Sequence, residues 1–369
     1  MKHSFTKIIM SVLKEHFEKN AEQIFENSEL LKYINQKTIS ANKGSKARGS
    51  FGNLYAIYVL VEDYINKGFY KKGNYSKYEG AKFSDLLQRQ RELPFGAKLQ
   101  NHALNQRMNQ EFKKYFPTCD FIPIIRVVET KRYWININLL KVKINQNKVN
   151  IAFAVIDIIN AYINSKKEAF DNFVETCEQL SEFENGQREK VKEFIINLLK
   201  PNVDARIFEI VSYSILKANY IEQSVFFGFS RESIEEEKLK LYKTGRTNAN
   251  DGGIDFVMKP LGRFFQVTET TDVKKYFLDI DKLEKFPITF VVKSTETPEY
   301  LKKKIKEGAK QQYSIEAVVN KYIDCIEEIV NIPKLKEALK LVEKNGKLSD
   351  ILNEIIKQSK VEFNYNEEI

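Results

Sequence analysis

Residues 250–269 constrain the fold more than any other stretch, because two short apolar runs there carry polar residues where a buried strand should have none. The flanks are rich in β-formers. Asn-Asp-Gly-Gly opens the first run at 250–253, and Lys-Pro-Leu-Gly at 259–262 supplies turn residues between the runs. The pattern predicts an antiparallel hairpin with Met258 beside Arg263.

Counting back from that pair sets Asp255 opposite Gln266. Because side chains alternate between the two faces of a strand, each face of the hairpin receives a fixed set of residues. One face would carry Asp255, Val257, Phe264, Gln266 and Thr268, and the other Ile254, Phe256, Phe265, Val267 and Glu269. A carboxylate, an amide and a hydroxyl then converge on the first face. A slip of one residue would bring in Glu269 instead of Gln266.

Helical and strand-like segments surround the hairpin in an α-β-β-β-α-β order. A helix over 204–220 leads to a strand over 224–229, then to the hairpin, a helix over 271–286 and a β-branched strand over 288–292. A strand–helix–strand crossover of this kind places the two strands that it joins parallel. Residues 231–250 interrupt the order with a charged, helix-like insert that ends in a polar loop.

Three regions follow from the change of pattern along the chain. Residues 1–195 are predicted to be mostly helical with a mixed α/β part, 196–300 hold the α-β-β-β-α-β core, and 301–369 return to helical periodicity. We therefore expect an α/β (α+β) fold with a mixed central sheet and large helical additions.

The composition is that of an ordinary folded protein with a basic balance. Its 59 Lys and Arg against 50 Asp and Glu give a net charge of +9, which favours a polyanionic partner. Three dispersed cysteines and three histidines without ligand spacing argue against a disulfide framework and against zinc or histidine-metal sites. No apolar run reaches the roughly 20 residues that cross a bilayer. We expect a protein of the reducing cytoplasm without a membrane segment.

Glu209 adds a second carboxylate to the one in the hairpin. It lies at the flank of the apolar stripe of the helix over 204–220, where its side chain can reach the adjoining sheet. Two carboxylates about 4 Å apart repel by about 4 kcal/mol at an effective dielectric of about 20, and a bound divalent cation reverses that repulsion. Mg²⁺ prefers oxygen ligands, so Glu209, Asp255 and Gln266 form a candidate magnesium site. The plainer alternatives are a simple Asp-Gly-Gly turn and a solvated glutamate.

These features together resemble the PD-(D/E)xK nuclease superfamily, especially restriction endonucleases. The resemblance covers residues 204–293 and rests on the order of elements, the helix glutamate, Asp-Gly-Gly-Ile-Asp before a turn and the Gln-Val-Thr triplet at 266–268. It implies a restriction-endonuclease-like core at 196–300, with Asp255 and Gln266 as magnesium ligands and Glu209 as the helix acid. The whole chain is also similar to HaeII-like type II restriction enzymes. That similarity implies a GC-rich palindromic target, a homodimer and a cognate DNA methyltransferase in the same system.

The sequence departs from the family pattern at the last position of the triplet, where Thr268 replaces the usual lysine. The motif therefore does not supply the residue that activates water or stabilises charge. Lys259, Lys274 and Lys293 are candidates to supply a lysine from elsewhere, and Glu269 is a further candidate ligand.

Basic residues in the region 1–195 and one in the insert are the candidates for DNA contact. Arginine side chains can fork onto guanine edges, and a small-residue loop such as 41–50 lets backbone amides approach phosphates. The candidates are Lys43, Lys46, Arg48, Arg89, Arg91, Arg107 and Arg246. Each of them, taken singly, is more often a solvated surface charge.

The sequence thus favours a magnesium-dependent type II restriction endonuclease. It would hydrolyse phosphodiester bonds of double-stranded DNA at a short palindromic sequence, with the region 1–195 reading the bases. Two alternatives stay open. One is a nuclease of the same fold that acts in repair or in restriction of modified DNA, and the other is a catalytically inactive DNA-binding protein, which the missing triplet lysine would fit.

Overall fold

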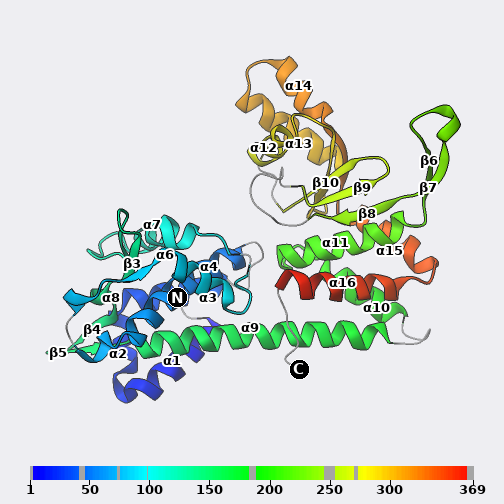
Figure 1. Cartoon of the computed structure of the whole chain (residues 1–369). Helices are drawn as coiled ribbons and strands as arrows, with labels where there is room; N and C mark the ends of the chain where they lie inside the picture. The colour runs from blue at the N-terminus through cyan, green and yellow to red at the C-terminus, as the bar shows by residue number, and fades with distance from the viewer. Residues whose placement is uncertain are drawn as a thin grey trace. The chain divides into compact units, whose positions relative to one another are not determined.

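The predicted hairpin is present in the computed structural model of the chain, as strands β9 (Phe256–Lys259) and β10 (Arg263–Thr268) (Figure 1). The two strands pair antiparallel, with Arg263 opposite Met258. The register predicted from the turn residues between the two runs is therefore confirmed.

The hairpin forms the middle of a five-stranded mixed sheet in the order β12-β11-β10-β9-β8. β8 (Lys240–Lys243) pairs antiparallel with β9. On the other side, β11 (Ile288–Val292) is parallel to β10, and β12 (Ile326–Val330) is parallel to β11. The predicted crossover from β10 to β11 thus joins parallel strands.

The structure describes residues 3–40, 46–72, 75–97, 99–182, 188–244, 254–269 and 273–363. Within this mixed α/β protein, contacts divide the chain into two compact units. The first unit comprises Met1–Phe173 with Lys360–Ile369, and the second comprises Val174–Ser359, so the division falls inside the long helix α9 (Ala152–Ser181). The predicted core at 196–300 and the segment 301–359 lie in the same unit.

The first unit is mainly helical, with two small antiparallel sheets. Its helices are α1 (Ser4–Phe17), α2 (Ala21–Asn27), α3 (Glu29–Ser40), α4 (Lys46–Asn66), α5 (Phe69–Lys72), α6 (Phe83–Glu92), α7 (Met108–Tyr115) and α8 (Ile137–Leu140), with short turns Glu18–Asn20, Tyr75–Lys77 and Ala103–Arg107. Its strands are β1 (Ala81–Lys82), β2 (Ile124–Val127), β3 (Arg132–Ile135), β4 (Lys141–Ile144) and β5 (Asn147–Asn150). Because residues 50–61 of α4 are apolar on nearly every side, this part of the helix lies buried in the core of the unit.

In the second unit, helices cover both faces of the five-stranded sheet. Its helices are α10 (Arg188–Leu198), α11 (Ala205–Tyr220), α12 (Val273–Lys282), α13 (Pro298–Gln312), α14 (Glu316–Asp324), α15 (Ile332–Lys344) and α16 (Leu348–Phe363). On one face, Tyr213 of α11 contacts Phe256 of β9 with ring centroids 5.1 Å apart. On the other, Tyr276 of α12 contacts Phe290 of β11 at 4.6 Å. We call these the α11 face and the α12 face.

Three segments differ from the prediction. The charged segment 231–250 holds strands β7 (Glu235–Lys238) and β8 rather than a helix, because Leu239 and Leu241 alternate with exposed residues and enter the core. The strand β6 (Ser224–Phe227) forms but pairs with β7 in a separate hairpin, so β8 takes its predicted place in the sheet. In the helical region after 300, β12 is an additional strand. In addition, α4 begins at Lys46, which makes 46–50 helical, and residues 41–45 lie outside the described part.

Among the helices of the described residues, none combines the length and the apolar character that crossing a membrane requires.

Candidate functional site

One end of the five-stranded sheet collects the residues predicted to carry the chemistry. β8 ends at Lys243, β9 begins directly after Asp255, and β10 and β11 end at Thr268 and Val292. Because β9 runs opposite to β8 and β10, its first residue meets the last residues of its neighbours. The topology therefore brings residues that lie far apart in the sequence to one edge.

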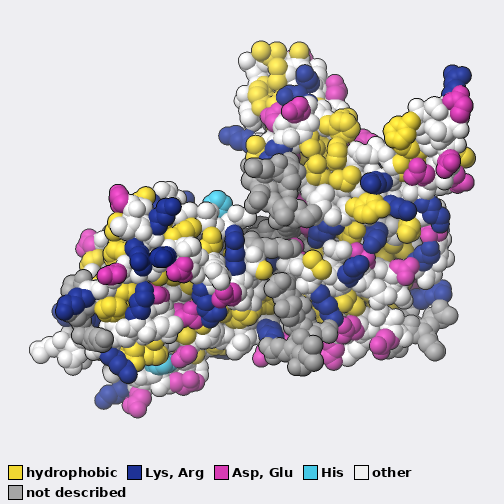
Figure 2. All heavy atoms as spheres, in the orientation of Figure 1, with side chains coloured by type: hydrophobic (Ala, Val, Ile, Leu, Met, Phe, Trp, Pro, Cys, Tyr) yellow, Lys and Arg dark blue, Asp and Glu magenta, His cyan; other side chains and the backbone are white. Residues whose placement is uncertain are grey.

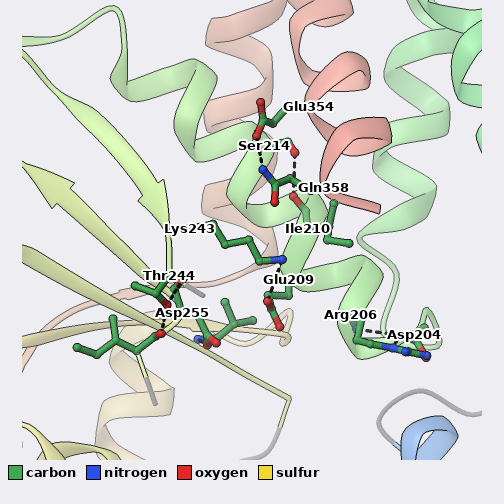
Figure 3. A network of polar contacts seen from close by, with 12 residues as sticks. Asp204, Arg206, Glu209, Ile210, Ser214, Lys243, Thr244, Asp255, Glu354 and Gln358 are labelled. Carbon is green, nitrogen blue, oxygen red and sulfur yellow. Dashed lines mark hydrogen bonds and ion pairs between the residues drawn. The ribbon is translucent and has the colours of Figure 1, made fainter. Parts of the chain in front are cut away.

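Glu209 takes part in a buried ion pair with a residue that the sequence did not single out. Asp204 caps α11 by accepting the backbone N–H of Arg206, and this start places Glu209 in the second turn of the helix. Its Oε1 lies 3.2 Å from Nζ of Lys243, and the two side chains are 9% and 12% exposed. Figure 3 shows the Lys243 ammonium group directed at Glu209 of α11.

Lys243 reaches Glu209 because of its place in β8. Leu241 and Lys243 share the side of the strand that faces α11, and the hydroxyl of Tyr213 on α11 donates to the backbone oxygen of Leu241 at 3.2 Å. The alternation in Leu-Lys-Leu-Tyr-Lys at 239–243 is the signal that could have revealed this lysine.

Asp255 does not simply continue the ladder opposite Gln266. The regular pairing ends at Phe256 and Phe265, and the N–H of Asp255 donates to the oxygen of Phe265 at 3.0 Å. Its carboxylate Oδ2 accepts the N–H of Val267 at 2.7 Å. In a regular antiparallel ladder, this N–H would donate to the backbone oxygen of residue 254 instead. Asp255 and Phe256 thus both lie opposite Phe265, as in a β-bulge. The predicted face-sharing of Asp255 with Gln266 is corrected by this local irregularity.

Gln266 and Thr268 lie buried on the α12 face. Their partners in the parallel strand are Phe290 and Val292, which belong to the apolar cluster beneath α12 and α13. Nε2 of Gln266 is 3.5 Å from the oxygen of Val267, and no hydrogen-bond donor to Oε1 is found among the described residues. A buried amide oxygen in this state is an acceptor that suits a cation or a bound water.

Lys293 and Glu269 form a second carboxylate–ammonium pair at the same end of the sheet. Their Nζ and Oε1 atoms are 2.6 Å apart, and the Lys293 side chain is only 2% exposed. The same ammonium donates to the backbone oxygen of Val203 and lies 5.6 Å from the ring centroid of Phe208, next to Glu209. The backbone N–H of Lys293 donates to the oxygen of Thr268 at 2.9 Å. Lys293 is therefore bound directly beside the position where the motif lacks its lysine.

The structure places the other two lysine candidates at the surface. Lys259 is exposed at the opposite end of β9 from Asp255, and Lys274 is exposed on α12. Of the lysines proposed from the sequence, Lys293 contacts Glu269, and Lys243, which the sequence did not single out, contacts Glu209.

The candidates for DNA contact in the first unit are spread over several elements. Arg89 of α6 forms a bidentate pair with Glu62, with both N–O distances 2.8 Å, and Arg91 donates to the oxygen of Leu99. Arg107 is exposed at the end of the turn before α7. Lys43 and Arg246 lie outside the described residues, as do the side chains of Lys46 and Arg48. The fork of Arg89 is occupied by Glu62, and Arg91 and Arg107 are exposed.

The oxygen atoms at the sheet end suit a hard cation such as Mg²⁺. Glu209, Asp255 and Glu269 contribute carboxylates, whereas the buried amide oxygen of Gln266 lies on the opposite, α12 face of the sheet. Within the described ranges, histidine, cysteine, aspartate and glutamate alone form no group of three that could hold a metal.

Comparisons of the chain with protein-family models, with curated proteins and with solved structures found no match. The functional interpretation rests on the sequence and the geometry alone.

Proposed function

We propose that the protein is a magnesium-dependent endonuclease that hydrolyses phosphodiester bonds in double-stranded DNA, with a restriction-endonuclease-like core in its second unit. The observation that carries the proposal is that the carboxylates of Glu209, Asp255 and Glu269, with the ammonium groups of Lys243 and Lys293, lie at one end of a sheet built in the order α11-β8-β9-β10-α12-β11. This is the order expected from the resemblance, with β8 in place of β6.

Each residue of the cluster has a chemical role in this proposal. Glu209 and Asp255 would hold the magnesium ion, and the N–H of Val267 fixes the Asp255 carboxylate. Glu269, whose carboxylate contacts Lys293 beside Phe208 of α11, is the third candidate ligand in place of Gln266, which faces α12. When bound by these residues, a magnesium ion would supply a water of lowered pKa and would offset the charge that develops on a phosphodiester.

Two lysines can replace the one that the triplet lacks. Lys243 and Lys293 each place an ammonium group against a carboxylate of the cluster, where a cation stabilises negative charge on a phosphate. In a site without magnesium these ammonium groups neutralise Glu209 and Glu269. The proposal therefore does not need a lysine at position 268.

Cleavage of DNA by the purified protein tests this function. Plasmids of different sequence are incubated with Mg²⁺ or with a chelator, and the ends of the fragments are mapped. We expect cuts in the magnesium samples only, at fixed positions that share a short sequence. If DNA of many sequences stays intact in both magnesium and manganese, the endonuclease proposal is wrong and a catalytically inactive DNA-binding protein is favoured.

The same experiment, repeated with methylated plasmid, distinguishes a nuclease that restricts modified DNA from one that is blocked by methylation of its site. If methylated plasmid is cut and unmethylated plasmid is not, the enzyme restricts modified DNA. If methylation at the mapped sequence protects, a cognate methyltransferase is part of the system.

A further inference from the structure

The hairpin formed by β6 and β7 stands out from the rest of the second unit (Figure 1). Phe226 and Phe229 are 79% and 98% exposed, and Ile234 is 51% exposed. β7 is exposed along its whole length, and β6 is at most half-buried. Figure 2 shows apolar and acidic side chains together on this hairpin. An isolated two-stranded hairpin is marginally stable in water, so this one gains stability when another surface covers it.

Hydrogen bonds fix the turn at the tip of the hairpin. The N–H groups of Phe229 and Ser230 both donate to Oγ of Ser233, at 3.1 Å and 2.9 Å. A Cβ atom on Gly228 would come within 2.4 Å of the oxygen of Ser233, so glycine is required there. The exposed Phe229 is therefore presented on a fixed scaffold.

The two edges of the hairpin differ in how they are protected. The outer strand β7 carries Glu235, Glu236 and Glu237 in a row, and charged side chains discourage another strand from pairing with an edge. The edge of β6 is Ser-Val-Phe-Phe at 224–227, with no charge and no proline, and β7 is its sole strand partner in the described part of the chain. One edge is blocked and the other is left open to pairing.

We propose that β6 pairs antiparallel with β6 of a second copy of this chain, across a two-fold axis. The result is a four-stranded sheet in the order β7-β6-β6-β7, in which the uncharged edges meet and the phenylalanines of both copies pack together. A strand that pairs with itself in this way closes as a dimer because each copy presents the same surface. The two acidic β7 strands lie at the outer edges, where they do not face each other.

The charge of the hairpin favours this partner over DNA. Residues 224–238 hold four glutamates against Arg231 and Lys238. Acidic side chains repel a phosphate backbone, so insertion of the exposed phenylalanines into DNA is less favourable than pairing with a second copy of the chain. The proposal assigns an interface to the homodimer that the resemblance implies, and the observations behind it do not depend on the nuclease function.

The backbone groups of β6 point alternately to β7 and to the free edge, and this alternation identifies a substitution that affects the free edge alone. The N–H of Leu239 donates to the oxygen of Gln223, so Val225 and Phe227 also direct their backbone groups to β7. Ser224 and Phe226 therefore direct theirs to the free edge. Phe226→Pro removes an outward N–H and leaves the β6–β7 ladder in place. Glu236, opposite Phe226, is the matched position on the other edge, and Glu236→Pro is the control.

Sedimentation velocity of the full chain over a range of micromolar concentrations tests the proposal. We expect a dimer for the wild type and for Glu236→Pro, and a dissociation constant raised at least about tenfold by Phe226→Pro. Phe226→Lys, which keeps the backbone N–H but sets like charges across the axis, should weaken the dimer as well. A wild type that stays monomeric, or a dimer that both Phe226 variants leave unchanged, overturns the proposal.

Discussion

Replacing Lys243 by methionine should destabilise the second unit, because it leaves the carboxylate of Glu209 buried without its counter-charge. At the observed separation of 3.2 Å, the attraction is roughly 5 kcal/mol at an effective dielectric of about 20. Desolvation of the two side chains offsets part of it, and breaking a buried pair by removing one partner costs about 3–5 kcal/mol. We expect Lys243→Met to lower the free energy of unfolding by about 3 kcal/mol.

The magnitude can be separated from a general packing effect with a matched pair on the same helix. Lys217 of α11 lies 2.8 Å from Glu354, but its side chain is 36% exposed, so Lys217→Met should cost about 1 kcal/mol or less. The double variant Glu209→Gln with Lys243→Met should lose much less than the sum of the two single losses, since the residues are in contact.

Urea unfolding followed by far-UV circular dichroism is the assay, because the single tryptophan, Trp134, belongs to the other unit. Magnesium adds a second readout. If the ion binds at Glu209, it should restore part of the stability that Lys243→Met loses, by about 2.7 kcal/mol at a hundredfold excess over its dissociation constant. A loss below about 1 kcal/mol without any effect of magnesium would refute the pairing and the site together.

Two further predictions concern the stability and the reactivity of buried groups. Burial raises the pKa of Asp279, which is 4% exposed and has one carboxylate oxygen without a described hydrogen-bond partner. A raised carboxyl pKa contributes stability that is complete below the unfolded pKa and is lost as pH rises through the folded one. Asp279→Asn should therefore stabilise the protein by about 1 kcal/mol at pH 7 and not at pH 4, as urea midpoints at the two pH values would show; equal effects at both would contradict it. Burial also raises the pKa of the Cys177 thiol to about 12 and raises that of Cys325, so native protein treated with a thiol reagent at pH 8 should react first at the more accessible Cys119. Mass mapping that finds Cys177 modified first would oppose this order.

The register of the hairpin could be predicted because a short turn fixes it. Once the turn residues at 259–262 were recognised, the pairing of Met258 with Arg263 followed by counting. The last step of the count failed at Asp255, because its carboxylate replaces a backbone group in the ladder. A side chain that competes with the main chain leaves no trace in an alternation pattern.

Strands β8 and β12 could not be predicted because their sequences also suit a helix. In β12, the apolar residues Ile326, Ile329 and Val330 stand at the spacing of a helix face, and in the segment before β8 three consecutive glutamates favour a helix over a strand. Pairing with β11 and β9 outweighs these local preferences. For the same reason Lys243, which needs β8 to be a strand, did not emerge as a site residue.

The central claim is tested most directly by comparing plasmid cleavage by the wild type, Asp255→Asn and Glu354→Gln in magnesium. Glu354 is an acidic residue of the same unit that pairs with Lys217, outside the sheet end. We predict that the wild type and Glu354→Gln convert supercoiled plasmid to discrete fragments, whereas Asp255→Asn binds DNA equally well and leaves it intact. Cleavage by Asp255→Asn at the wild-type rate, or no cleavage by the wild type, would contradict the claim.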